Sequence, residues 1–167
     1  MKPIDSFINK KRLLSVVLFT FSALIVWGLF VFFMYGREFW GGDPFILGGL
    51  LSALSASLIV SYKISPRIYN YQSLESRLSL PFGLGVLITL LSYLLGSVLF
   101  GISFSLFEML EGSGFILDKQ AIQGAFLLII VGFLYCITFM SPGFILGGIV
   151  GILVFRLTRE KEFNSTS

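Results

Sequence analysis

The chain has 167 residues, of which 56% are apolar and only 13% are charged, and its net charge is +3. A typical globular domain is about half apolar and about a quarter charged, so this chain has too few polar side chains to cover a water-soluble core. These proportions argue against a soluble enzyme, a disordered tail and a nucleic-acid-binding module, and they favour a protein embedded in a membrane.

Two residue types that carry much of protein chemistry are scarce. The sequence contains no histidine and one cysteine, Cys136. A Ser-His-Asp triad, an internal disulfide and a CxxC pair are therefore impossible within the chain. We expect no enzymatic activity, no cofactor and no metal. Cys136 lies in an apolar run and is expected to pack as a small hydrophobic residue.

Four apolar runs, each without Asp, Glu, Lys or Arg, occupy residues 13–35, 44–62, 80–107 and 121–155. About 20 apolar residues in a helix cross the hydrocarbon core of a bilayer, and backbone groups in lipid must be hydrogen-bonded internally. The sequence therefore predicts an all-α membrane protein, a bundle of four transmembrane helices that forms a single domain over residues 1–167. The first run is too long for a typical cleaved signal peptide and is interpreted as an uncleaved signal anchor.

The positions of the basic residues predict how the helices are oriented. Of the 12 Lys and Arg residues, all but Arg37 and Lys119 lie before the first run, between the second and third runs, or after the last run. With four spans these three segments share one side, and basic loops stay in the cytoplasm. We therefore expect both termini in the cytoplasm and the chain in a plasma membrane, for which the short loops suggest a bacterial inner membrane. The positive charge thus reports topology and gives no support for nucleic-acid binding.

The last run is too long for one straight crossing, and Ser141-Pro142-Gly143 interrupts it. Proline removes a backbone donor and clashes with the preceding turn, so the helix is expected to break there. One interpretation is a single crossing with a bent cytoplasmic extension. The alternative is a hairpin followed by a fifth short span over residues 143–155, which would place the C-terminal basic residues outside. Because segments rich in Lys and Arg stay in the cytoplasm, the basic residues after the last run favour four spans.

A short sequence similarity connects the second and last runs. Residues 45–49 and 144–148 both read Phe-Ile-Leu-Gly-Gly, and a proline precedes each of them closely. Glycine- and proline-interrupted segments in repeated positions often mark the binding sites of transporters. Coincidence in a chain rich in these residues is the simpler explanation, and a genuine repeat would favour the hairpin.

Small residues spaced four apart form three candidate helix-packing stripes. Such a stripe lets a second helix approach closely, whether it belongs to the same chain or to a partner. The members are Gly143, Gly147 and Gly151 in the last run, Gly48, Ser52 and Ala56 in the second, and Ser97, Gly101 and Ser105 in the third. Packing within the monomer is the simpler explanation, because four helices must contact one another in any case.

Two polar segments between the runs carry weaker signals. Glu108, Glu111 and Asp118 give the third loop three carboxylates, which are expected to be a solvated acidic loop. The segment 63–79 predicts either a plain loop or a short interfacial helix that begins at Pro66 with Ser65 as its cap.

These observations favour a non-enzymatic membrane protein that acts through helix–helix contacts, as an accessory, assembly or immunity-type protein. Its expected partners are the lipid bilayer and either another membrane protein or a second copy of this chain. The alternative is a subunit of a small oligomeric transporter or channel, and the glycine-rich break at Pro142 is the evidence for it. A third hypothesis is an enzyme that uses Glu108, Glu111 or Asp118 at the outer surface.

Overall fold

The computed structural model describes residues 3–36, 44–69, 78–111, 119–139 and 141–163, and every element in these segments is a helix. The all-α prediction is therefore confirmed for the described residues. The helices are α1 (Pro3–Tyr35), α2 (Pro44–Ile64), α3 (Pro66–Tyr69), α4 (Ser79–Glu111), α5 (Lys119–Phe139) and α6 (Pro142–Phe163).

Proline and glycine mark the ends of these helices. Four of the six described helices begin with a proline: Pro3, Pro44, Pro66 and Pro142. The first helical position suits proline, because its missing N–H would have no partner there. Helix α1 ends before Gly36, whose φ of 60° is a left-handed conformation that glycine adopts without a steric penalty.

Helices α1 and α6 extend beyond the apolar runs into neighbouring charged residues, α1 before its run and α6 after its run. Helix α1 includes Lys10, Lys11 and Arg12, and α6 continues through Arg156. Lys and Arg are good helix formers. Charge therefore limits the apolar run without ending the helix, so these two helices are longer than their apolar runs.

Within the described part of the chain, three helices are long and apolar enough to cross a membrane, over Lys10–Phe33, Ile46–Ile68 and Ser79–Phe104. A fourth candidate is the pair Phe126–Thr138 and Pro142–Thr158, which meets the same test only when its two bent parts are taken together. The bend between them is 71°. Helix α6 therefore turns aside from the direction of α5 but does not reverse it.

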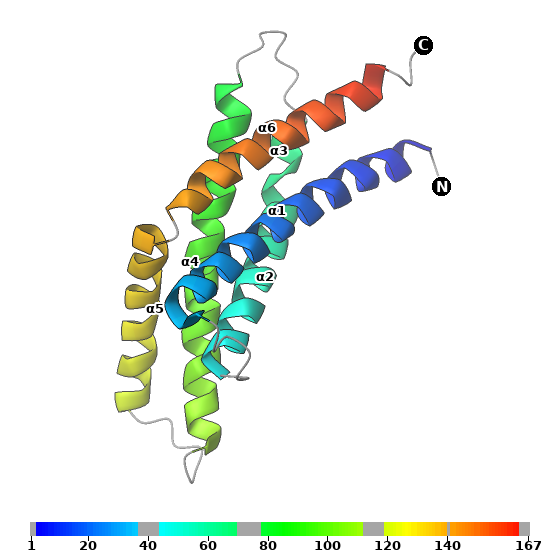
Figure 1. Ribbon diagram of the computed structural model, residues 1–167. Coiled ribbons are helices and arrows are strands. Elements are labelled where there is room, and N and C mark those ends of the chain that lie inside the picture. Colours follow the sequence, from blue (N-terminus) through cyan, green and yellow to red (C-terminus); the bar gives the residue numbers. More distant parts are fainter. Residues whose placement is uncertain (1–2, 37–43, 70–77, 112–118, 140, 164–167) are drawn as a thin grey trace.

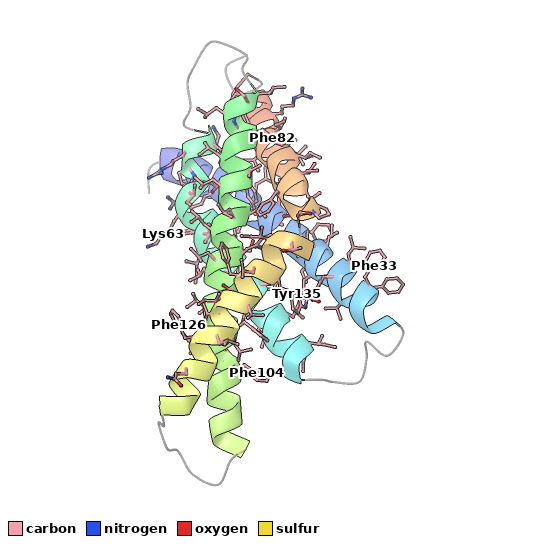
Figure 2. All side chains as sticks on the ribbon, turned by 90° about the vertical axis from the view of Figure 1, so that its left-hand side faces the viewer. Phe33, Lys63, Phe82, Phe104, Phe126 and Tyr135 are labelled. Carbon is pink, nitrogen blue, oxygen red and sulfur yellow. The ribbon has the colours of Figure 1, made fainter. Side chains whose placement is uncertain are left out.

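Helix α4 is the centre of the bundle. It packs against α2, α5 and α6, while α1 packs against α2 and α6. Figure 1 shows that α1 and α6 run side by side, and that the N-terminal end of α1 and the C-terminal end of α6 lie at the same end of the molecule. Figure 2 shows the same arrangement from the side, with Lys63 near that end and Phe104 and Phe126 toward the other.

That end of the bundle is called the basic end here, because Lys10, Arg12, Lys63 and Arg67 lie there. Arg12 of α1 donates a hydrogen bond of 3.2 Å from Nη1 to the Tyr62 hydroxyl of α2. The Arg12 guanidinium carbon also lies 4.5 Å from the centre of the Tyr62 ring, a cation–π contact. This pair of contacts thus connects α1, at the start of its apolar part, to the last turn of α2.

The buried core lies toward the basic end. It consists of residues from five helices: Phe19, Val60, Ile68, Ile88, Val150 and Val154. Ile68 comes from α3, the short helix predicted as one alternative for residues 63–79. The start of α3 at Pro66 agrees with that alternative, but the Ser65 hydroxyl has no hydrogen-bond partner and does not cap the helix. Ile68 is fully buried, so α3, which follows the end of α2, packs against the core through this residue.

Candidate functional site

A pocket with a volume of about 340 Å³ lies between the helices, next to the core. Residues of five helices line it. They are Phe19, Ser22, Ala23, Val26, Trp27 and Phe30 of α1, Gly49, Ala53 and Ser57 of α2, Ile88, Thr89, Ser92, Tyr93, Gly96, Ser97 and Phe100 of α4, Leu128, Val131, Gly132, Tyr135 and Cys136 of α5, and Gly143 of α6. Phe19 and Ile88 belong to both the core and the pocket, so the core closes the pocket toward the basic end.

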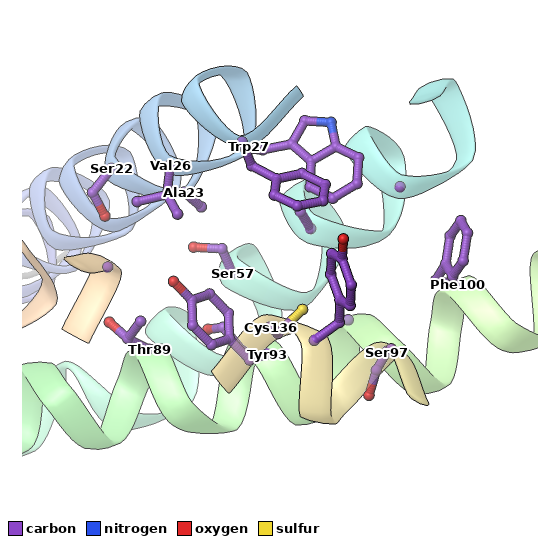
Figure 3. A pocket seen from close by; sticks show the side chains of 18 of the residues that line it. Ser22, Ala23, Val26, Trp27, Ser57, Thr89, Tyr93, Ser97, Phe100 and Cys136 are labelled. Atoms are coloured by element: carbon purple, nitrogen blue, oxygen red, sulfur yellow. The ribbon is translucent and has the colours of Figure 1, made fainter. Parts of the chain in front are cut away.

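Hydroxyl groups gather on one side of the pocket, which we call the hydroxyl side (Ser22, Ser57, Thr89 and Tyr93). Figure 3 shows these four groups, contributed by α1, α2 and α4, around one part of the space. Ser22 donates its proton to the Phe19 carbonyl oxygen at 2.8 Å, and Thr89 donates to the Gly85 carbonyl oxygen at 3.1 Å. Since each proton is engaged by its own helix, these two residues of the lining can act toward a ligand only as acceptors.

Aromatic rings form the opposite side, which we call the aromatic side (Trp27, Phe30, Phe100 and Tyr135). The Trp27 and Phe30 ring centroids are 5.4 Å apart, and Phe30 meets Tyr135 edge to face at 5.8 Å. The Phe30–Tyr135 contact connects α1 to α5. The Trp27 indole nitrogen is buried without a hydrogen-bond partner, and in Figure 3 it points away from Tyr93.

The lining contains no Asp, Glu, Lys or Arg among its described residues. A charged group placed in this pocket would therefore lack a counter-charge, and burial of an unpaired charge is costly. The predicted small hydrophobic role of Cys136 fits its place in the lining, where it is partly buried. The pocket can therefore hold an uncharged molecule.

The predicted packing stripe of α6 lies against α4. Side-chain atoms built on its glycines would overlap α4: at Gly143 the Tyr93 hydroxyl, at Gly147 the Thr89 hydroxyl, and at Gly151 the Pro81 carbonyl oxygen. A side chain on Gly85 would overlap the Gly147 carbonyl oxygen in turn. The close approach of α4 and α6 therefore depends on glycine in both helices.

The stripe of α2 also faces α4, farther along that helix. A Cβ on Gly48 would lie 3.8 Å from the Phe100 ring, and one on Gly96 would lie 3.7 Å from Ala56 and 3.9 Å from the Ser52 carbonyl oxygen. These are ordinary van der Waals distances. Of the third stripe, Ser97 lies opposite Gly132 of α5, with 3.6 Å between the Ser97 Cβ and a Cβ built on that glycine.

The two Phe-Ile-Leu-Gly-Gly segments both lie in the first turns of their helices, directly after the proline in α2 and one residue later in α6. Each follows the proline that begins α2 or α6, and the first glycine of each faces α4. The second glycine of each lies beneath an aromatic ring, Gly49 under Trp27 and Gly148 under Phe82. The similarity therefore corresponds to a common way of packing, although the two rings come from different helices.

The three acidic residues of the predicted third loop lie outside the part of the chain whose side chains the structure describes. Glu108 and Glu111 belong to the last turn of α4, beyond the part of that helix whose side chains are described, and Asp118 lies outside the described residues. In the described part of the chain, no group of three His, Cys, Asp or Glu residues could hold a metal ion.

The sequence alone did not identify the pocket, because its lining is assembled from five separate helices. One signal was present: Tyr93 and Tyr135 lie deep inside apolar runs, where their hydroxyls require partners on other helices. Tyr93 packs against Phe144 of α6, with 5.3 Å between ring centroids, and Tyr135 packs against Phe30 of α1. Comparison of the chain with protein-family models, curated proteins and solved structures found no match, so a functional assignment depends on this geometry.

Proposed function

We propose that the chain is a non-enzymatic, four-span integral membrane protein that binds a small uncharged molecule from the lipid phase in the pocket between its helices. One observation carries this proposal: a pocket of about 340 Å³, lined mainly by apolar side chains, lies at the middle of the candidate spans. Pockets for small molecules are largely apolar and contain a few converging polar groups. A lipid-soluble molecule reaches such a site through the bilayer itself.

The four-span topology is supported by the direction of α6. A hairpin would reverse the chain at Pro142, whereas the bend between α5 and α6 is 71°. The described basic residues of α1, α2 and α3 share the end at which α6 finishes. Under the positive-inside rule, this end faces the cytoplasm of a plasma membrane, which we propose to be bacterial.

Fluorescence of Trp27 tests the binding proposal directly. Trp27 lines the pocket, and Trp40→Phe makes it the only tryptophan in the chain. In phosphatidylcholine nanodiscs, a brominated alkane is expected to quench Trp27 with a saturable component at low probe concentration. Quenching that rises only in proportion to the probe in the bilayer would contradict the proposal.

Transport of the bound molecule is a second candidate, favoured by the position of the helix break. Gly143, directly after the break, lines the pocket. Broken helices at mid-membrane recur at the substrate sites of transporters. Solute flux into proteoliposomes, measured with a compound that passes the Trp27 test, is expected if this role is correct, and binding without flux would exclude it.

The accessory or assembly role through helix–helix contacts stays a prediction from the sequence. This prediction was based on the lack of typical catalytic residues together with the small-residue stripes. In the structure, Gly143, Gly147 and Gly151 have α4 of the same chain as their neighbour. These stripes therefore support the fold of the chain more than they support a partner protein.

A further inference from the structure

We infer that the ligand of the pocket is an uncharged amphiphile that carries a hydrogen-bond donor, such as a hydroxyl group, and inserts this group on the hydroxyl side with its apolar part on the aromatic side. This inference depends on the proposed function, because it assigns a chemical class to the molecule that the pocket binds. It rests on three features: the lack of charged side chains in the described lining, the bonds that two hydroxyl protons already make, and the gathering of four hydroxyl groups on one side of the pocket.

The ligand must be uncharged because the described lining holds no charged side chain. An ion in this pocket would lose its hydration and gain no opposite charge. The hydroxyl groups of the lining supply dipoles only. A fatty acid anion or a quaternary amine is therefore disfavoured relative to a neutral molecule of the same length.

The polar group is inferred to be a donor because two of the four residues on the hydroxyl side, Ser22 and Thr89, can act toward a ligand only as acceptors. Ser22 and Thr89 donate to carbonyl oxygens of their own helices, at 2.8 and 3.1 Å. A helix in a membrane keeps these internal bonds, since a hydroxyl proton facing hydrocarbon would otherwise have no acceptor. A ligand hydroxyl can donate to the remaining lone pairs, whereas an ester or ketone, which only accepts, cannot.

The orientation follows from the two sides of the pocket. The hydroxyl side lies next to the core at the basic end, where Phe19 and Ile88 close the space. The aromatic side lies farther along α1 and α4, at Trp27, Phe30 and Phe100. An apolar chain that extends from the hydroxyl side therefore passes along Trp27. Bromine atoms at the middle of this chain then quench Trp27 fluorescence when the ligand inserts with its polar group on the hydroxyl side.

The experiment compares three brominated probes of equal chain length on the Trp40→Phe protein in nanodiscs. They are stearyl alcohol, methyl stearate and, in mildly alkaline buffer, the stearate anion, each dibrominated at mid-chain. The alcohol is expected to reach half of its saturable quenching at a concentration about 3- to 10-fold lower than the methyl ester, the effect of one hydrogen bond. The anion is expected to be the weakest of the three.

Variants then locate the donor's partner. Ser22→Ala and Thr89→Val are expected to reduce the preference for the alcohol over the ester, because each removes one acceptor. Ser15→Ala and Thr138→Val are the matched controls. Ser15 and Thr138 make the same kind of bond to their own helix, at 3.0 and 2.8 Å, but do not line the pocket, so the preference is expected to be unchanged.

The outcomes separate this inference from the proposed function. Saturable quenching that is equal for alcohol and ester, or strongest for the anion, overturns the ligand class while the pocket stays a binding site. Linear quenching by all three probes overturns both. If Ser22→Ala or Thr89→Val fails to fold, the comparison of probes on the Trp40→Phe protein still decides the ligand class.

Discussion

The carbonyl oxygen of Gly147 occupies the space that a side chain on Gly85 would require. Helices α4 and α6 thus approach until the backbone of one helix fills the position of a Cβ on the other. Because α6 follows the break after α5, this contact fixes the direction of α6 and places Gly143 at the pocket. The glycines of α6 are therefore structural supports of the candidate site.

Substitution of these glycines is expected to destabilise the fold. Gly85→Ala and Gly151→Ala each place a Cβ against a backbone oxygen, which cannot move without shifting its helix, and we expect losses of about 1–3 kcal/mol in the free energy of unfolding. Circular dichroism in detergent, followed during thermal or SDS unfolding, measures the change.

Gly28→Ala provides the matched control for that experiment. A Cβ at Gly28 meets no atom within 4 Å. Alanine is a better helix former than glycine by about 1 kcal/mol, so this variant is expected to be equally stable or slightly more stable. Equal destabilisation by all three substitutions would contradict the close α4–α6 contact.

Two neighbouring glycines of α2 are expected to behave differently. A Cβ at Gly49 overlaps the Trp27 ring, whereas one at Gly48 lies 3.8 Å from Phe100. In the Trp40→Phe background, Gly49→Ala is therefore expected to displace the indole, shift the Trp27 emission maximum and weaken probe quenching. Gly48→Ala is expected to leave the spectrum unchanged. An identical response of the two variants would place Trp27 elsewhere.

Much of the fold follows from simple properties of the sequence. Apolar length predicted where the long helices lie, and the chemistry of proline at Pro142 predicted the break between α5 and α6. The apolar runs did not give the helix ends, because lysine and arginine belong to the helix before the run in α1 and after the run in α6.

The pocket could not be predicted in the same way. The stripe at Gly143, Gly147 and Gly151 indicates a close helix neighbour but does not identify it, since spacing within one helix carries no information about its partner. Likewise, Ser22 and Thr89 are ordinary polar residues in their own runs. They become a site only when α1 and α4 bring them to the same space.

Membrane topology is tested by labelling a cysteine at the C-terminus. In a Cys136→Ser, Ser165→Cys protein, intact cells treated with an impermeant maleimide are expected to stay unlabelled, because four spans leave both termini in the cytoplasm. Permeabilised cells, in which the new thiol becomes accessible, supply the control. Labelling in intact cells would instead support five spans.

The most direct test of the account is to fill the pocket. In the Trp40→Phe background, Ala23→Phe adds a ring to the lining, while Ile25→Phe adds one on the same helix at a residue that is 40% exposed and does not line the pocket. Ala23→Phe is expected to abolish saturable quenching of Trp27 by brominated stearyl alcohol, and Ile25→Phe is expected to preserve it. Saturable quenching that survives Ala23→Phe unchanged would contradict binding in this pocket.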